Sequence, residues 1–334
     1  MLPIAQAMRL AHCSDLHLLS HDGARWLDLA NKRWIGAMNL LSSRSRHYHV
    51  AAFDDMVDDM NAMGIEHVLC TGDVTNLALR REFEFARAKF DKLALGPNDV
   101  TVIPGNHDAY VAEGVPLFSE VFGPYAQPDA GWEWEEDHRH SADDILHWPI
   151  VRIRGELAII GLSTSRSTPW FTAYGSLGQG QCKRLKHVLS DPRLAGKVRV
   201  VAIHHPPAGV RARSRIRGLK DHLAFAHVIA ECGADLIVHG HEHRDMVETL
   251  AGPEGAHVSV RGVCSGTYFH NKVDRIARYR IYDIDGGQIV GDHVRIWDRE
   301  ARKFAPQVDP DPVVGINQGA TDGRQDPERR ADRG

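Results

Sequence analysis

Short apolar runs alternate with segments of helical periodicity along most of the chain. Between residues 50 and 63, apolar side chains recur every three or four positions, which predicts an amphipathic helix that ends at Gly64. Residues 79–93 and 178–190 show weaker helical patterns. Strands that alternate with helices are typical of an α/β sandwich. The predicted strands are residues 9–14, 67–71, 100–104, 157–162, 198–204 and 235–239.

The C-terminal part of the chain has a different pattern. Three apolar segments predict antiparallel strands, with a tight turn at residues 285–287. From about residue 305, Pro, Gly, Asp and Arg replace the large apolar residues, which predicts a disordered tail over 305–334. We therefore expect one domain over residues 8–304. The three predicted strands are residues 257–263, 275–285 and 287–297.

Composition narrows the class of protein. The chain of 334 residues has 40 Lys and Arg against 44 Asp and Glu, a formal charge of −4, so we expect no stable binding to nucleic acid. Five scattered cysteines predict no disulfide framework, and the N-terminus lacks a signal-peptide pattern. These features predict a cytoplasmic protein, with a peripheral position at the inner membrane face as the alternative. The 21 His residues raise the question of a metal site, because imidazole is a common metal ligand.

Five of the predicted strands run directly into side chains that can bind metal. In open α/β folds, sites form where strands end and loops begin, so we expect these five loops to meet. His nitrogen with carboxylate oxygen suits Zn, Fe or Mn better than Ca. Seven candidate ligands are too many for one tetrahedral site and fit two metals that share a bridging carboxylate, which we assign to Asp73. The candidate ligands are Asp15, His17, Asp73, Asn106, His204, His241 and His243.

Local spacing gives these ligands a structural reason. Asp15 and His17, like His241 and His243, are two residues apart, so in extended segments each pair would point the same way. Each motif alone also has an ordinary explanation, such as a helix cap or a buried His pair, but chance does not comfortably produce all five in this order. A glycine precedes three of the ligands and would let the backbone approach a metal or phosphate closely. These glycines are Gly72, Gly105 and Gly240.

The order DxH, GD, GNHD, HHPP, GHxH over residues 9–245 resembles the calcineurin-like metallophosphoesterases, in the branch with GNH[DE] and GHxH that includes many phosphodiesterases. The resemblance implies a four-layer αββα sandwich of two mixed β-sheets, with a dinuclear metal site at the C-terminal ends of the strands. It implies two divalent ions per chain, and His204 as a ligand in preference to His205. One ion would bind to Asp15, His17, Asp73 and His243, and the other to Asp73, Asn106, His204 and His241.

Such a site would hydrolyse a phosphodiester or pyrophosphate bond. Two divalent ions lower the pKa of a shared water, and the resulting bridging hydroxide would attack phosphorus. His107 would stabilise the developing charge or protonate the leaving oxygen, and Asp108 could hold the tautomer of His107. The alternative for His107 is a packing role beside the ligands. A binding scaffold is the non-enzymatic alternative, and the complete ligand set favours an enzyme.

The substrate is the open question. Residues 25–47 combine Trp and Leu with basic residues, which suits either a lipid-facing insertion or a helix packed on the domain. Two segments resemble pyrophosphatases that cleave UDP-diacylglucosamine in lipid A synthesis: KRWIGAMN, within residues 25–47, and TGDVTNLALRREFEFAR, which follows later in the chain. Cyclic-nucleotide phosphodiesterases, the alternative, share only the metal-binding motifs with this chain. Arginines alternate over 211–217; in an extended segment they would face one way and bind a second phosphate, and in a helix they would scatter. We predict Arg211, Arg213 and His205 as substrate-binding residues.

Overall fold

Two six-stranded sheets form the centre of the protein in the computed structural model, which describes residues 7–18, 48–134, 148–270 and 272–307. The first sheet consists of β1 Met8–Cys13, β2 His67–Cys70, β3 Val100–Val102, β10 Arg278–Asp285, β11 Gln288–Asp298 and β12 Lys303–Pro306. The second consists of β4 Ile150–Arg154, β5 Leu157–Gly161, β6 Val198–Ala202, β7 Leu236–His239, β8 Met246–Ala251 and β9 His257–Gly262.

Both sheets are mixed. The first has the order β12-β11-β10-β1-β2-β3, in which β1, β2 and β3 are parallel and β10 is antiparallel to β1. The second has the order β4-β5-β6-β7-β9-β8, with the antiparallel strands β4 and β8 at its edges. The parallel strands bring the loops after β1, β2, β3, β6 and β7 toward a common region.

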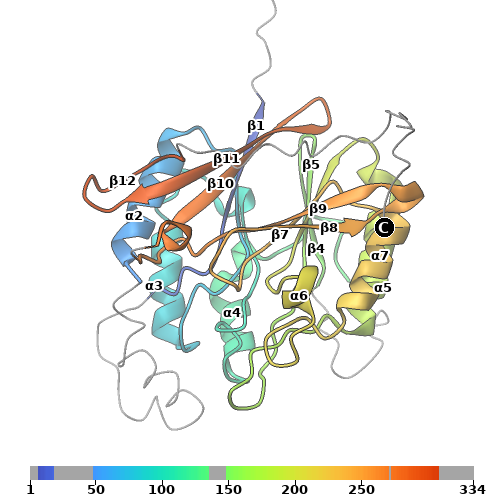
Figure 1. The fold of residues 1–334 in the computed structure, drawn as a ribbon, viewed down its shortest axis with the longest axis horizontal. Helices are drawn as coiled ribbons and strands as arrows, with labels where there is room; N and C mark the ends of the chain where they lie inside the picture. Colours follow the sequence, from blue (N-terminus) through green and yellow to red (C-terminus); the bar gives the residue numbers. More distant parts are fainter. Residues whose placement is uncertain (1–6, 19–47, 135–147, 271, 308–334) are drawn as a thin grey trace, which may run out of the picture.

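Helices cover both outer faces. Figure 1 shows α2, α3 and α4 on the side of the first sheet and α5 and α7 on the side of the second, so the layers are helix, sheet, sheet, helix. The predicted αββα sandwich is therefore confirmed. The helices are α2 Val50–Ala62, α3 Arg80–Phe90, α4 Gly114–Phe122, α5 Gly178–Leu189, α6 Gly209–Ala212 and α7 His222–Cys232. Short 3-10 helices lie at Pro97–Asp99, Gly123–Tyr125, Pro192–Leu194, Pro253–Gly255 and Val273–Arg275.

Alternate side chains of the second sheet belong to two hydrophobic cores. Along β6, Val198, Val200 and Ala202 pack in the core shared with the first sheet, whereas Val201 packs with α5 and α7. This period of two buries both faces of a parallel strand, which explains its continuous apolar sequence. Among the described residues, no helix is both long and apolar enough to cross a membrane.

The apolar pattern located most of these elements. All six strands predicted before residue 240 are present, with ends within two residues of those expected, and α2, α3 and α5 lie in the predicted helical segments. The pattern missed β4, β8, β12, α4, α6 and α7. The segment 257–263 forms β9, which is antiparallel to β8 as expected of this segment, but it lies in the second sheet, parallel to β7, and not beside the other two C-terminal strands. Strand β12 continues to Pro306, two residues beyond the expected boundary at 304. Residues 25–47 and the tail from 308 onward lie outside the described residues.

A buried carboxylate begins α3. Glu82 accepts hydrogen bonds through Oε2 from the backbone N–H groups of Leu77, at 2.9 Å, and Leu79, at 3.1 Å. Burial is the main reason that the pKa of Glu82 is raised to about 7, because the two N–H donors offset only part of the desolvation of the charge. The folded protein therefore binds a proton here over a pH range in which the unfolded chain does not.

This shift predicts a pH-dependent stability. Between about pH 4.5 and 7 the folded state holds the Glu82 proton more tightly, so the free energy of unfolding should fall as the pH rises through this range, by up to about 3 kcal/mol. In Glu82→Gln the amide oxygen can accept both hydrogen bonds and does not ionise. Urea unfolding at pH 5 and pH 8 should therefore show that the free energy of unfolding of the wild type falls between these pH values. In Glu82→Gln the fall should be smaller by the contribution of Glu82. Parallel pH curves for the two proteins would contradict the assignment.

Candidate dinuclear metal site

The loops that follow the strands hold five of the seven predicted ligands in left-handed backbone conformations. The φ angles are 53° for Asp15, 44° for His17, 55° for Asp73, 72° for His241 and 51° for His243. A residue with a side chain adopts this region at a cost on the order of 1–2 kcal/mol, and such strain concentrates at functional sites. The expected extended alternation is therefore wrong. Sharp turns, and not extended segments, bring Asp15 beside His17 and His241 beside His243.

The glycines before the ligands allow these turns to pack closely. A Cβ atom on Gly105 would collide with the Asp73 side chain, and one on Gly240 would collide with Asp15. Gly72, with a φ of 97°, lies directly against the backbone of Gly105. The backbone at these glycines does approach other groups closely, as predicted. The groups that it approaches are the ligand side chains and the backbone of a neighbouring loop.

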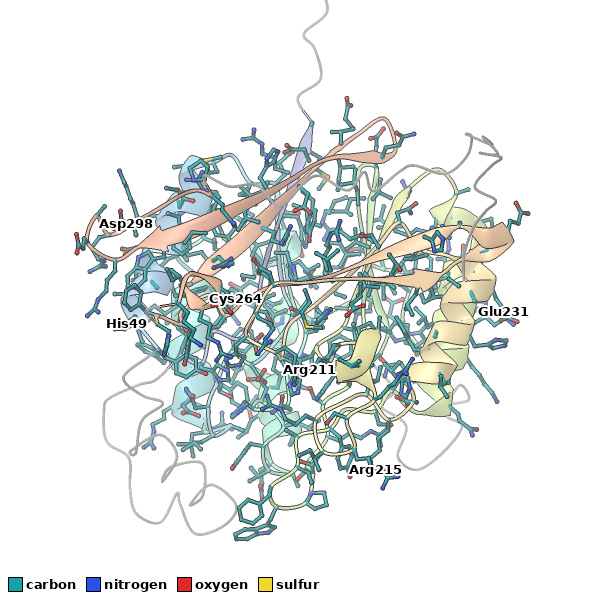
Figure 2. The ribbon with its side chains drawn as sticks, in the orientation of Figure 1. His49, Arg211, Arg215, Glu231, Cys264 and Asp298 are labelled. Atoms are coloured by element: carbon teal, nitrogen blue, oxygen red, sulfur yellow. The ribbon has the colours of Figure 1, made fainter. Side chains whose placement is uncertain are left out.

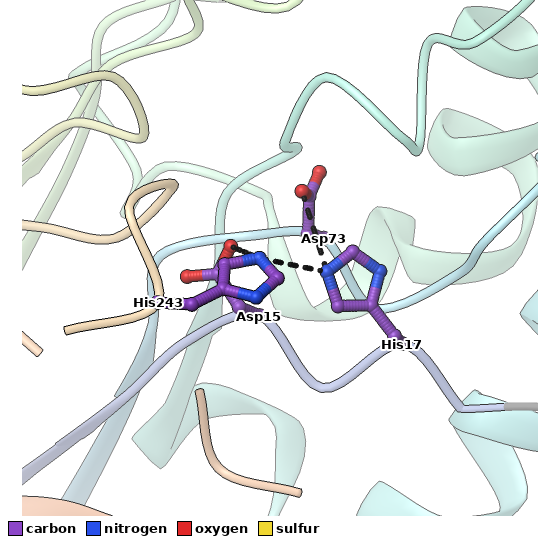
Figure 3. A group of neighbouring side chains, drawn as sticks. All are labelled: Asp15, His17, Asp73 and His243. Carbon is purple, nitrogen blue, oxygen red and sulfur yellow. Dashed lines mark hydrogen bonds and ion pairs between the residues drawn. The ribbon is translucent and has the colours of Figure 1, made fainter. Parts of the chain in front are cut away.

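The first group of ligands converges from three loops (Figure 3). The Nε2 atoms of His17 and His243 are 3.2 Å apart, and Nε2 of His243 is 3.1 Å from Oδ1 of Asp15. Oδ2 of Asp73 lies 3.8 Å from Nε2 of His17. All four side chains thus turn a potential ligand atom toward one point, and all but His243 are buried.

The second group shares Asp73 with the first. Oδ2 of Asp73 is 3.5 Å from Nε2 of His204, and the Oδ1 atom of Asn106 is 3.1 Å from that same nitrogen. Asn106 Oδ1 is also 2.8 Å from Nδ1 of His241. One oxygen of Asp73 therefore faces both groups, which is the geometry expected of a bridging carboxylate.

Hydrogen bonds on the opposite sides of the rings fix the orientation of the His ligands. Nδ1 of His204 lies 2.7 Å from the carbonyl oxygen of Thr71, and Nδ1 of His17 lies 3.3 Å from that of Thr75. A carbonyl only accepts, so in both rings Nδ1 carries the proton and Nε2 presents a lone pair to the site. Nδ1 of His243 is 3.1 Å from the hydroxyl of Tyr48.

The electrostatics of the site suit cations. Burial, as the main cause, lowers the pKa of His204 and His241, so both rings are neutral at pH 7, the form that binds metal. Burial, followed by repulsion from Asp15 and Asp108, raises the pKa of Asp73. Burial also opposes ionisation of Asp15, but the neighbouring imidazoles, first His243, outweigh it and lower the pKa of that carboxyl.

The donor set fits two divalent ions. Nε2 of His241 is buried without a hydrogen-bond partner. A buried polar atom without a partner is unfavourable, and a cation that accepts its lone pair would satisfy it.

The comparisons with known proteins agree with this geometry. Residues 8–245 match the family of calcineurin-like phosphoesterases. The chain belongs to this family. A search of curated proteins found no match.

Solved structures show how widely the fold of this phosphoesterase is shared. A dimetal phosphatase from Danio rerio superimposes with a TM-score of 0.54 at 14% identity, over 90% of this chain and 98% of the other. A purple acid phosphatase from yellow lupin (Lupinus luteus) seeds superimposes with a TM-score of 0.51 at 10% identity, over 90% of this chain and 53% of the other. At these identities the likeness concerns the fold. Family membership and the complete ligand groups together make the protein a metallophosphoesterase of the dimetal type.

His107 and Asp108 have separate surroundings in this phosphoesterase. Nδ1 of His107 lies 2.7 Å from the carbonyl oxygen of Asn76, which fixes its tautomer, and the ring lines the cavity beside the ligands. The carboxylate of Asp108 is fully buried and accepts hydrogen bonds from the backbone of Val74, Thr75 and Gly105 and from the Thr75 hydroxyl. The expected pairing of Asp108 with the His107 ring is therefore wrong. Asp108 ties the GD loop to the GNHD loop, and the Asn76 carbonyl orients His107.

Of the predicted substrate-binding residues, only Arg211 borders the site. A cavity of about 490 Å³ is lined by ligand residues, His107, Arg211 and Arg217, and Arg213 is not among its lining residues. The alternating arginines are not extended, because α6 includes Arg211 and a turn follows it. His205 is buried, with Nδ1 2.7 Å from the Thr164 hydroxyl and Nε2 3.1 Å from the Ala173 carbonyl oxygen. Both of its ring nitrogens bind protein, so the substrate-binding prediction for His205 is wrong.

Sequence reasoning missed four contributors to the site. Tyr48 contacts the ligand His243, and Arg244 and Arg275 line the cavity. Asn76 lies three residues after Asp73, so the extended motif GDVTN was an available signal for it. Tyr48 and Arg275 stand outside every motif, and only the folding of distant segments brings them to the cavity.

Proposed function

We propose that this chain hydrolyses phosphodiester or pyrophosphate bonds, with two divalent ions, drawn from Mn, Fe and Zn, held by the two ligand groups. The observation that carries this proposal is the shared cavity. Asp73, Asn106 and His107 line the same space as Arg211 and Arg217, so a phosphate at the ligand groups would have cationic side chains beside it. A substrate with a second negatively charged phosphate or a bulky ester group matches such a lining better than a phosphate monoester does.

The residues of the chain divide the chemistry between them. When bound, the two ions would activate a water and neutralise charge on the phosphate oxygens. Nδ1 of His107 keeps its proton toward the Asn76 carbonyl, so donation to the leaving oxygen would come from Nε2 of the imidazolium form, in which both ring nitrogens carry a proton. The backbone N–H of His107 donates to Oδ1 of Asp73 at 2.7 Å, which couples the position of this ring to the bridging carboxylate.

The lining of the cavity also supports the choice of substrates for the first assay. Tyr110 and Phe171 provide aromatic surface, and Ile216 provides aliphatic surface. This mixture is compatible with a nucleotide and with an amphiphilic pyrophosphate such as UDP-diacylglucosamine, so both belong in the test.

The experiment is metal analysis of the purified protein, followed by assays of the Mn²⁺-loaded enzyme. Its substrates are bis-p-nitrophenyl phosphate, cyclic AMP, UDP-diacylglucosamine in detergent and, as the monoester control, p-nitrophenyl phosphate. We expect close to two ions per chain and turnover of diesters or of the pyrophosphate well above that of the monoester. Preference for the monoester would overturn the proposal, and preference for UDP-diacylglucosamine would narrow it to the lipid pyrophosphate.

Arg217 is the residue expected to bind the anionic part of the substrate. It lines the cavity, and its positive charge adds to burial and to the charge of His243 in lowering the pKa of His204. Arg217→Ala should raise KM about tenfold, the equivalent of one charge-assisted hydrogen bond, while metal content stays unchanged. Steady-state kinetics would measure this effect, with Lys92→Ala as a control that removes an exposed cation just after α3, where it pairs with Asp54. An unchanged KM would exclude contact between Arg217 and the substrate.

A further inference from the structure

Two neighbouring loops beside the cavity expose a cluster of apolar side chains. We define the loop surface as residues 165–175, between β5 and α5, and residues 209–220, between β6 and α7. Backbone hydrogen bonds join the loops, from Ala173 N–H to the Ile216 carbonyl at 2.7 Å and from Lys220 N–H to that of Gly175 at 3.0 Å. Of the eight large apolar side chains that are strongly exposed in the described part of the chain, four lie here. They are Trp170 at 55%, Phe171 at 80%, Val210 at 78% and Ile216 at 55%.

The tip of the first loop is held in shape, so this exposure is not that of a loose segment. The hydroxyl of Thr168 donates to the carbonyl of Thr172, and the hydroxyl of Thr172 donates to that of Pro169, both at 2.7 Å. Phe171 has a φ of 63°, an unfavourable region for a bulky residue, while its ring points out of the protein. A strained backbone that presents an aromatic ring to the exterior points to a role for that ring outside the protein's own core.

The loop surface carries positive charge without any acidic residue in either segment. Arg166, Arg213, Arg215 and Lys220 add to the two arginines that line the cavity. Arg211 pairs with Glu242 at 3.3 Å, and Arg213 and Arg215 are exposed in the same segment as Val210 and Ile216. Figure 2 shows Arg211 beside α6 and Arg215 at the lower edge of the molecule. This sign of charge is complementary to a polyanionic surface and opposite to the net charge of −4 of the whole chain.

We propose that the loop surface docks on an anionic lipid membrane. Aromatic and aliphatic tips would enter the interface, and the surrounding arginines would contact headgroup phosphates. A single-stranded nucleic acid would use the aromatic rings and the arginines, but it offers nothing to the exposed aliphatic side chains of Val210 and Ile216. The apolar tips together with the charge therefore favour lipid.

Docking in this orientation would place the mouth of the catalytic cavity at the headgroups. Phe171 and Ile216 belong both to the loop surface and to the lining of the cavity. A phosphate ester with a lipid tail could then reach the ligand groups without fully leaving the membrane, and this last step alone rests on the proposed function. The docking itself requires no catalysis.

Vesicle co-sedimentation tests the docking independently of turnover. The purified full chain is mixed with vesicles of phosphatidylcholine alone, or of phosphatidylcholine and phosphatidylglycerol in equal amounts. We expect the protein to bind to the anionic vesicles, to bind less tightly as the salt concentration is raised, and to bind little to the neutral vesicles.

Two double variants test the loop surface. One combines Trp170→Ser and Val210→Ser, and the other combines Arg213→Ala and Arg215→Ala. Each should weaken partitioning to the anionic vesicles about tenfold or more. The matched control, Val247→Ser with Val290→Ser, changes exposed apolar residues on β8 and β11 and should bind as the wild type does. Thermal melting checks that each variant is folded.

Four outcomes would overturn the proposal. The first is no binding of the wild type to anionic vesicles. The second is binding that both loop variants retain, which would move the membrane contact to another segment, such as residues 25–47. The third is that the wild type sediments as a dimer in sedimentation velocity, whereas the variant with Trp170→Ser and Val210→Ser is the only one that sediments as a monomer. This result would mean that the loop surface binds a second copy of the chain. The fourth is single-stranded DNA that binds at least as tightly as the vesicles and competes with them.

Discussion

Asp73→Ala is expected to abolish metal-dependent phosphoester hydrolysis and to reduce the bound metal from two ions to one or none. The reason is that a single oxygen serves both ligand groups, since Oδ2 of Asp73 lies 3.8 Å from Nε2 of His17 and 3.5 Å from Nε2 of His204. Removal of a bridging carboxylate leaves each ion with fewer ligands and without the shared charge that holds the pair together. No other side chain in the two groups occupies both.

Metal analysis and hydrolysis of bis-p-nitrophenyl phosphate measure this effect together. Asp73→Asn separates two roles, because its side-chain oxygen can still accept the hydrogen bond from the His107 N–H, while the charge is lost. Burial raises the pKa of Asp73, so without metal its ionised carboxylate is a cost to folding, and we expect metal-free Asp73→Asn to melt no lower than the metal-free wild type. Asp298→Ala, at the end of β11 (Figure 2), is the control. Full metal content and full activity in Asp73→Ala would contradict the dinuclear assignment.

His107→Ala is expected to keep both metals and to lower kcat on the order of 10²–10⁴-fold. The ring lines the cavity but lies outside both ligand groups, and its Nδ1 is committed to the Asn76 carbonyl. Loss of the metal would instead mean that His107 supports the ligands, through its edge-on contact with the His17 ring at 4.8 Å or otherwise.

The leaving group distinguishes proton donation from charge stabilisation. If Nε2 of His107 protonates the leaving oxygen, a p-nitrophenyl ester, whose phenolate leaves readily, should lose much less rate in the variant than an alkyl ester does. If the ring only stabilises charge on the phosphate, both esters should lose rate equally. His227→Ala, which removes an exposed imidazole from α7, is the matched control. If His107→Ala hydrolysed both esters at a rate within about twofold of the wild type, His107 would have only a packing role.

The sequence was sufficient to locate the candidate ligands because the loop that holds each of them follows an apolar strand. A strand buried on both faces needs a continuous run of apolar residues. The residue after that run therefore lies in the loop at the C-terminal end of the strand, where sites form in α/β folds. For this reason Asp15, Asp73, Asn106, His204 and His241 could be placed at one end of the sheets before the fold was known. The same rule does not place Tyr48 or Arg275, which reach the cavity from loops without any such run.

Local pattern failed where the partner of a side chain is distant in sequence. Asp108 is adjacent to His107, and adjacency suggested a pair, but its carboxylate is fully occupied by Val74, Thr75 and Gly105. His205 is adjacent to a ligand, yet its ring turns into the protein between Thr164 and Ala173. Neighbouring residues along a chain point in different directions, so adjacency cannot decide which group a ring contacts.

The sequence by itself determined the α/β class, the family motifs and the candidate ligand side chains, because apolar periodicity and residue chemistry are local properties, and the resemblance of the motifs to a known family implied the two-sheet layout. The tertiary structure alone decided that five ligands sit in left-handed turns, that one oxygen of Asp73 faces both groups, and that Arg217 lines the cavity while Arg213 does not. These properties depend on how loops from two sheets pack against each other. That packing is set by contacts between residues far apart in the sequence, such as the one between His17 and His243, which are 226 positions apart, and no local pattern contains such contacts.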